Sequence, residues 1–265
     1  MIIFFLLTIY IDNATKLPVG VQANGLGGIT TVIDEGLSVF HNPALNNQTK
    51  FNFTLSRWLY GTNLINFGAS YKNNALGINY LNYGIIQGYD EYGLPTNRFA
   101  PYDLSIGIGR SFGPLGFCIK NFQSRVDSVL FAGLTLGMSS YIDLGILKIG
   151  AKIDNIGKEF VHNIEVPLLL CIGARFVLPE NFDIFLETKG NDFELSTGFL
   201  YRYENLKIFL GSRYLEPEEF VEGISLSDLT FSGGLTVIFD EYELGYSFIY
   251  TQFSNAHQLG IIFVP

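Results

Sequence analysis

The chain has 265 residues with no linker and no abrupt change of composition, which fits one large domain. Apolar residues make up 48% of the sequence and charged residues only 15%, against about 25% charged residues in typical soluble domains. The net charge of -9 leaves no basic stripe to neutralise phosphates, so nucleic-acid binding is excluded. The apolar, aromatic composition is more typical of a membrane barrel than of a cytosolic enzyme.

Residues 1–14 are predicted to be an export signal peptide. Ile2 to Ile11 form an apolar run of about ten residues, too short to cross a bilayer as a helix but typical of a signal-peptide core. A buried first strand is the alternative. No later stretch contains 18 or more consecutive apolar residues, so the sequence predicts no membrane-spanning helix.

Residues 15–50 are predicted to form a plug inside a barrel, because they show no regular alternation of apolar and polar residues. A glycine cluster suits close approach of backbones, and a later Asn-Pro-Ala turn fixes the chain direction before the first strand. An acidic pair lies between the two. The residues concerned are Gly25, Gly27, Gly28, Asp34, Glu35, Asn42, Pro43 and Ala44.

Residues 51–265 are predicted to form the wall of an antiparallel transmembrane β-barrel. Nearly every segment alternates apolar and polar residues with period two, and most are about 8 to 12 residues long, as tilted membrane strands require. The fourteen segments are Phe51 to Leu59, Leu64 to Tyr71, Ala75 to Tyr83, Tyr102 to Phe112, Leu115 to Phe122, Val129 to Met138, Ile146 to Asp154, Val166 to Leu178, Phe182 to Thr188, Phe193 to Tyr203, Leu206 to Tyr214, Leu229 to Phe239, Tyr242 to Tyr250, and His257 to Val264.

The two faces of these segments favour a membrane barrel over a soluble sandwich. One face is apolar, and the other carries mainly Gly, Ser, Thr and Asn, whereas a solvated sandwich face would be rich in Lys and Glu. A charge facing lipid at mid-membrane would cost about 2–4 kcal/mol. Arg110 lies on the apolar face, near a segment end, and Trp58 and Tyr60 are expected in an interfacial girdle. The charges predicted to face the lumen are Lys120, Lys148, Lys152, Asp154, Arg175, Asp183, Glu187, Glu194, Arg202, Lys207, Arg213 and Glu243.

Connections of unequal length separate the two ends of the predicted barrel. Connections after even-numbered segments are short, whereas the long ones follow odd-numbered segments and so emerge on one side. They are residues 84–101, 123–128, 155–165, 215–228 and 251–256. This asymmetry is typical of outer-membrane barrels, which have short periplasmic turns and longer external loops. The sequence therefore predicts the outer membrane of a Gram-negative-type bacterium, with membrane lipid around the wall.

The N-terminal motifs resemble those of the PorV/PorQ family of outer-membrane proteins, which is itself similar to FadL-type transporters of hydrophobic compounds. Gly25, Gly27 and Gly28 match the family's glycine stretch, with Leu26 where the family has methionine. The turn from Asn42 to Ala44 matches its second motif, and the closing HQLGIIF resembles its last strand. The resemblance covers nearly the whole chain and implies a barrel with an N-terminal plug.

Histidine and cysteine patterns do not predict a metal site. His41, His162 and His257 are far apart and lack the spacing of metal ligands, and His41 is expected to be a hydrogen-bonded plug residue. Cys118 and Cys171 are expected to be two separate packed thiols, with a disulfide as the alternative.

Four strand carboxylates could include a catalytic pair, but a charge-paired lumen network fits them better. Asp183, Glu187, Glu194 and Glu243 share the lumen face with lysines and arginines. The sequence contains no Gly-x-Ser-x-Gly nucleophile elbow. No enzyme activity and no cofactor is predicted.

Two functional hypotheses follow, and a purely structural role for the barrel is a third alternative. The PorV/PorQ resemblance implies a component that helps type IX secretion deliver or attach exported proteins, with secreted proteins or secretion-machine subunits as partners. The FadL-like resemblance implies instead passive diffusion of a hydrophobic ligand past the plug. The loop 84–101 is mostly polar, with a short apolar patch at Ile85-Ile86, and this disfavours lipid capture by that loop.

Overall fold

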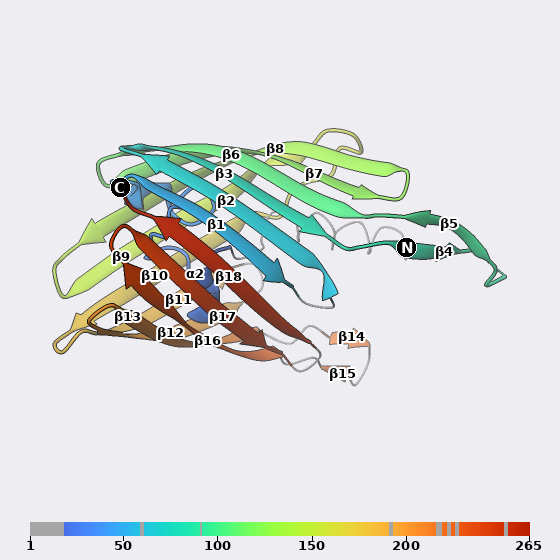
Figure 1. Cartoon of the computed structure of the whole chain (residues 1–265). Helices are drawn as coiled ribbons and strands as arrows, with labels where there is room; N and C mark the ends of the chain where they lie inside the picture. Colours follow the sequence, from blue (N-terminus) through green and yellow to red (C-terminus); the bar gives the residue numbers. More distant parts are fainter. Residues whose placement is uncertain are drawn as a thin grey trace.

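A computed structural model describes residues 19–58, 61–90, 92–190, 193–215, 219–221, 224–225, 228–251 and 254–265, with the side chains of 219–221, 224–225 and 228 left out of account. Fourteen antiparallel strands form a closed barrel, as predicted, and the first strand pairs with the last (Figure 1). The strands are β1 (Lys50–Arg57), β2 (Asn63–Tyr71), β3 (Asn74–Asn82), β6 (Tyr102–Phe112), β7 (Leu115–Val126), β8 (Val129–Asp143), β9 (Leu147–Glu159), β10 (Leu169–Leu178), β11 (Phe182–Gly190), β12 (Glu194–Tyr203), β13 (Leu206–Leu215), β16 (Asp228–Phe239), β17 (Tyr242–Tyr250) and β18 (Asn255–Phe263).

Two small hairpins lie in long connections outside the barrel wall. They are β4 (Ile86–Tyr89) with β5 (Pro95–Phe99), and β14 (Glu219–Val221) with β15 (Ile224–Ser225). Both lie at the end of the barrel opposite the C-terminus (Figure 1). We call this the long-loop end, and the other the short-turn end. Among the described residues, no helix is long and apolar enough to cross a bilayer.

The short turns form because polar residues adopt left-handed backbone conformations there. Glu180 and Asn181 have φ of 64° and 63°, and Glu204 and Asp240 have φ of 48° and 49°. Tight hairpin connections need positive φ to match the twist of the strands they join. Each strand therefore pairs with its neighbour in the chain, and the wall is a continuous meander.

Burial follows the alternation of the sequence. In β1, Phe51, Phe53 and Leu55 are exposed on the outside, whereas Asn52 and Thr54 are buried inside. The same pattern continues around the wall, so large apolar side chains cover its outer surface. A closed antiparallel barrel with polar groups inside and an apolar band outside is the architecture of Gram-negative outer-membrane proteins. The chain is an outer-membrane barrel, and by the general rule its short-turn end faces the periplasm.

Several expectations from the sequence are corrected. Trp58 does not lie in an interfacial girdle, because it continues the inward parity of β1 and is only 7% exposed. It packs at the long-loop end of the lumen against Leu64, Leu81 and Ile249. Tyr60 and the predicted signal peptide lie outside the described residues.

Some predicted loops are strand. β7 continues to Val126 and β9 to Glu159, beyond the predicted ends at Phe122 and Asp154, and β8 continues to Asp143. The ladder of β9 is interrupted by a register shift opposite Leu136 to Met138, where Asn155 has a positive φ of 64°. This irregularity breaks the alternation, which explains why the sequence pattern appeared to end there.

Candidate functional site: the plugged lumen

Residues 19–46, which we call the plug, fill the interior of the barrel on the side of the short turns. The plug contains a short helix, α2 (Val21–Gly25), and a 3-10 turn, η1 (Pro43–Leu45). Nearly all of its residues are buried, although few of them belong to a helix or a strand. The helix packs against β13, β16, β17 and β18, and η1 packs against β6, β7 and β8. The barrel wall therefore supplies the environment that holds the plug.

Ten wall strands each place an inward glycine against the plug. A Cβ atom at any of these positions would come within 3.0 Å of a plug atom. At Gly150 the clash would be with the backbone oxygen of Thr31 at 2.1 Å, and at Gly211 with the backbone nitrogen of Gly27 at 2.3 Å. The small inward residues thus make room for the plug backbone. The ten are Gly68, Gly77, Gly107, Gly116, Gly150, Gly173, Gly198, Gly211, Gly245 and Gly260.

The glycine motif of the plug also lies at close contacts. A Cβ on Gly25 would lie 2.1 Å from the ring of Phe209. Gly27 has a φ of +81° and its Cβ would lie 2.6 Å from the Ser212 carbonyl oxygen, while Gly28 has a φ of 84°. Glycine at these positions lets the plug turn sharply beside β13.

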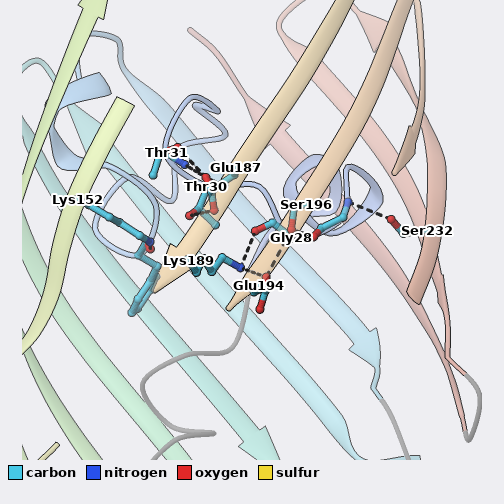
Figure 2. A network of polar contacts seen from close by, with 11 residues as sticks. Gly28, Thr30, Thr31, Lys152, Glu187, Lys189, Glu194, Ser196 and Ser232 are labelled. Atoms are coloured by element: carbon cyan, nitrogen blue, oxygen red, sulfur yellow. Dashed lines mark hydrogen bonds and ion pairs between the residues drawn. The ribbon is translucent and has the colours of Figure 1, made fainter. Parts of the chain in front are cut away.

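Serines of the wall bind the same segment. The Gly27 N–H donates to Ser232 Oγ at 3.0 Å, and Ser196 Oγ donates to the Gly27 carbonyl at 2.8 Å. Lys189 Nζ donates to the Gly28 carbonyl at 3.2 Å and is paired with Glu194 (Figure 2). The glycine motif is therefore held by side chains from β11, β12 and β16.

Glu187 of β11 makes the densest set of contacts between wall and plug. Its Oε2 accepts from the Thr30 N–H at 2.9 Å, the Thr31 N–H at 2.7 Å and the Thr31 hydroxyl at 2.6 Å, and its Oε1 accepts from the Thr30 hydroxyl at 3.3 Å (Figure 2). The carboxylate is 1% exposed. Hydrogen bonds to a charged acceptor are stronger than neutral ones, so Glu187 is a principal anchor of the plug.

The Asn-Pro-Ala motif fixes the other half of the plug. Asn42 Oδ1 accepts from the Ala44 N–H at 3.0 Å, which caps η1, and its Nδ2 donates to the carbonyls of Thr31 at 2.7 Å and Ser140 at 3.0 Å. Ser139 Oγ accepts from the Ala44 N–H at 3.2 Å. The motif therefore ties the two halves of the plug to each other and to β8.

Glu35 and His41 are buried ionisable groups of the plug. Glu35 accepts from the N–H groups of Gln22 and Ala23 at 2.9 and 2.7 Å, at the first turn of α2. Burial raises the pKa of its carboxyl to about 7, against the lowering effect of these hydrogen bonds. His41 Nε2 lies 2.6 Å from the Val19 carbonyl, and burial lowers the pKa of the imidazole to about 4. His41 is thus the hydrogen-bonded plug residue that was expected.

An apolar core joins the plug to one side of the wall. Phe185, Leu200 and Phe209 point inward and pack against plug residues that include Leu26 and Ile29. These three wall residues are not among the lumen residues predicted from the sequence. The signal was present, because each lies on the same face as lumen charges of its own strand, such as Asp183 and Arg202. A large apolar residue on the polar face of a barrel strand indicates a packed lumen.

The predicted lumen charges point inward and form short-range pairs. Asp183 binds both Arg175 and Arg202, Glu243 lies 2.7 Å from Lys207, and Asp154 lies 2.7 Å from Lys120. The remaining inward cations have different partners. Lys152 Nζ donates to the Phe40 carbonyl at 3.2 Å, Lys148 pairs with Asp143, and Arg213 lines a small cavity with Trp58.

The described residues include no group of three or more His, Cys, Asp and Glu side chains arranged to hold a metal ion. His162 lies beside Glu159 at the long-loop end, and the hydroxyl of Tyr246 meets His257 at 2.8 Å. Cys118 and Cys171 are both buried and free. These groups are dispersed over different strands.

The two ends of the lumen differ in chemistry. At the long-loop end, Trp58, Leu64, Leu81, Ile249 and Ala256 form an inward apolar cluster that we call the outer cluster. Between Trp58 and the plug the cavity measures only about 20 Å³, room for about one water molecule.

At the short-turn end the plug and wall line a partly open polar cavity of about 370 Å³, which we call the vestibule. Seven charged residues line it: the cations Lys50, Lys148, Arg175, Arg202 and Lys207, and the carboxylates Asp34 and Asp143. The plug thus separates an apolar outer end from a cationic inner end.

No protein-family profile and no curated protein sequence matches the chain. Solved structures of outer-membrane channels do. The deltaS2 mutant of the TodX monoaromatic hydrocarbon channel matches with a TM-score of 0.61 at 12% identity, over 94% of this chain and 97% of that chain. The CymD monoaromatic hydrocarbon channel gives 0.59 at 13% identity, over 94% and 98%. The Pseudomonas putida toluene transporter TodX gives 0.56 at 13% identity, over 92% and 96%. At these identities the similarity shows the shared fold of an outer-membrane barrel channel.

Proposed function

We propose that this chain is a passive outer-membrane channel for small hydrophobic molecules, closed by its plug in the state described above. The outer cluster is the observation that carries the proposal. Its five apolar side chains face the lumen at the long-loop end, although the inner face of the wall is otherwise mostly polar. The five side chains are 0–8% exposed and pack against one another, so an apolar solute that parts them would exchange water for apolar contacts.

The packed plug also favours this function over that of an open aqueous pore. The cavity beside Trp58 has room for about one water molecule, so a solute must displace plug residues to pass. The fold shared with two monoaromatic hydrocarbon channels is consistent with a hydrophobic solute. Passage would need no energy source, since the solute moves down its own gradient.

Uptake of radiolabelled toluene by diderm cells that express the protein tests the proposal. Trp58→Asn places a polar amide in the outer cluster and should reduce protein-dependent uptake about tenfold, by weakening apolar binding at the entrance. Leu94→Asn is the matched control, because Leu94 is 61% exposed on the external hairpin and does not belong to the outer cluster. Equal uptake by Trp58→Asn and the unmodified barrel, both assembled in the outer membrane, would contradict the proposal.

A second function, assistance to type IX secretion as in the PorV/PorQ family, is supported by a different feature. The hairpin β4–β5 and its flanks expose several large apolar side chains, more than the short Ile85-Ile86 patch seen in the sequence. Ile85 is 76%, Tyr89 66% and Tyr92 80% exposed. Exposed aromatic residues on a projecting hairpin suit a protein partner. Native mass spectrometry of the gently extracted barrel would reveal a stoichiometric exported protein if this function holds, and a protein-free barrel if it does not.

A further inference from the structure

Four cations form a row across neighbouring wall strands at the short-turn end. Lys148 of β9 lies directly opposite Arg175 of β10, and Arg202 of β12 lies directly opposite Lys207 of β13. Like charges in directly opposed positions destabilise a sheet. The wall therefore contains two unfavourable pairs, one on each side of β11, and a stabilising partner for them is to be expected.

The carboxylates of the protein offset this row only in part. A single carboxylate, Asp183 of β11, serves both arginines, with its Oδ2 accepting from Arg175 Nε at 2.9 Å and from an Nη of Arg202. Lys148 and Lys207 pair with Asp143 and Glu243, at 2.8 and 2.7 Å. Across the cavity Lys50 pairs with Asp34 at 2.7 Å. The five cations of the vestibule thus share four carboxylates.

The arginines have donors left for a ligand. Asp183 is fully buried in the wall, whereas the side chains of Arg175 and Arg202 are 24% and 30% exposed and line the vestibule. A guanidinium carries five N–H donors in a planar fork that matches phosphate and carboxylate. Asp183 uses only some of them. Both forks therefore present donors to a cavity of about 370 Å³.

We propose that the vestibule binds a molecule bearing a phosphate or carboxylate group, held by Arg175 and Arg202 with Lys148 and Lys207 beside them. The anion offsets the two like-charge pairs and uses the free guanidinium donors. The cavity accepts a small molecule, and the same chemistry is offered by a free anion of the periplasm or by the head group of an anionic lipid. The site lies on the periplasmic side of the plug, away from the outer cluster, so it does not depend on the proposed passage of hydrophobic molecules.

Calorimetric titration of the full-length barrel, folded in zwitterionic detergent at low ionic strength, tests the proposal. Inorganic pyrophosphate is the probe for a free anion, and phosphatidylglycerol in mixed micelles is the probe for a lipid head group. Screening is weak at this scale below about 0.1 M salt, where the Debye length is about 10 Å. We expect saturable binding of at least one probe, and the probe that binds identifies the source.

The double variant Lys148→Gln with Lys207→Gln separates binding from folding. It removes both like-charge pairs, so the barrel should assemble normally, while affinity for the probe should fall at least about tenfold. Arg202→Lys keeps the charge but replaces the planar guanidinium with an ammonium group, and should weaken binding by a smaller factor. Lys72→Gln is the matched control, since Lys72 is an exposed cation in the short turn after β2, outside the vestibule, and affinity should stay within about twofold.

Binding of neither probe would overturn the proposal. So would equal affinities for the double variant and Lys72→Gln, since that result would indicate general attraction to a cationic surface. Assembly of each variant is checked by its heat-modifiable mobility on gels. Binding of pyrophosphate or lipid by a barrel that fails the toluene-uptake test would leave this site standing. A barrel that passes the toluene-uptake test but binds neither probe would refute this site alone.

Discussion

The outer cluster and the vestibule are opposite ends of one lumen, and they are built from opposite kinds of side chain. The outer cluster contains a tryptophan and four aliphatic residues, whereas the vestibule is lined by five cations. Both use inward positions of the same fourteen strands. The difference shows that strand alternation decides which residues point into the lumen. It does not decide whether the inward residues at a given height of the barrel are apolar or charged.

The plug is what keeps the two ends distinct. It contacts inward glycines on ten strands, and the wall carboxylate Glu187 holds it at mid-height through four hydrogen bonds. Changes at these contacts should connect the two ends, and changes at the ends themselves should leave the separation intact. Three predictions test the role of the plug contacts in separating the two ends, from the largest expected effect to the smallest.

Gly150→Ala should break the separation most strongly. The new Cβ would lie 2.1 Å from the Thr31 carbonyl oxygen, and close-packed backbone cannot absorb such a clash, so the plug must shift away from β9. We expect ion conductance in planar bilayers to rise by about tenfold or more, as the lumen hydrates from end to end.

Gly190→Ala is the matched control, because its Cβ would meet nothing nearer than 3.6 Å. It should conduct like the unmodified protein. If Gly150→Ala stays as silent as Gly190→Ala while both assemble, the plug is not what closes the lumen.

Glu187→Ala should loosen the plug by removing hydrogen bonds, without the steric clash that Gly150→Ala introduces. Two buried N–H groups, of Thr30 and Thr31, lose their acceptor, and each unsatisfied group costs about 1–3 kcal/mol. A total of about 3 kcal/mol corresponds to roughly a hundredfold faster amide exchange of these residues. Hydrogen exchange followed by mass spectrometry measures the exchange rate of these amides. Glu187→Gln keeps one carbonyl acceptor and should give an intermediate rate, and equal rates in both variants would show that the hydrogen bonds are not the anchor.

The smallest effect expected is a pH dependence through Glu35. Burial raises the pKa of Glu35 to about 7 in the folded protein, from 4.5 as the ordinary value. Between these values the folded state holds a proton that the unfolded state has released, so stability should fall as pH rises from about 4.5 to 7 and stay low above it. Across pH 5 to 8 the expected loss is about 2.5 kcal/mol, because each pKa unit corresponds to about 1.4 kcal/mol.

Heat-modifiable mobility, recorded as a midpoint temperature from pH 5 to pH 8, measures this loss. Glu35→Gln carries no titratable group at that position, so its profile should lack the fall and should report the contribution of every other group. Parallel profiles for the two proteins would show that Glu35 does not control attachment of the plug.

Much of the wall could be predicted from the sequence because β-strand alternation is local. Each inward or outward position is set by its neighbours two residues away, so the strands around Lys148 and Ile149 and the fourteen-strand count follow from the pattern alone. The signal failed where that local rule is broken, as at the irregular Asn155 in β9, and where a residue beyond the strand continued inward, as at Trp58.

The sequence by itself determined the barrel, its inward charges and the presence of a non-alternating plug with Gly25 to Gly28 and Asn42 to Ala44 as its motifs. Only the tertiary structure decided which wall groups meet the plug, since Glu187 and Thr31 are 156 residues apart and closure of the barrel brings them together. It likewise decided that the lumen has an apolar outer end and a cationic inner end. Contacts of this kind depend on register and closure around the whole wall, and no local pattern in the chain encodes them.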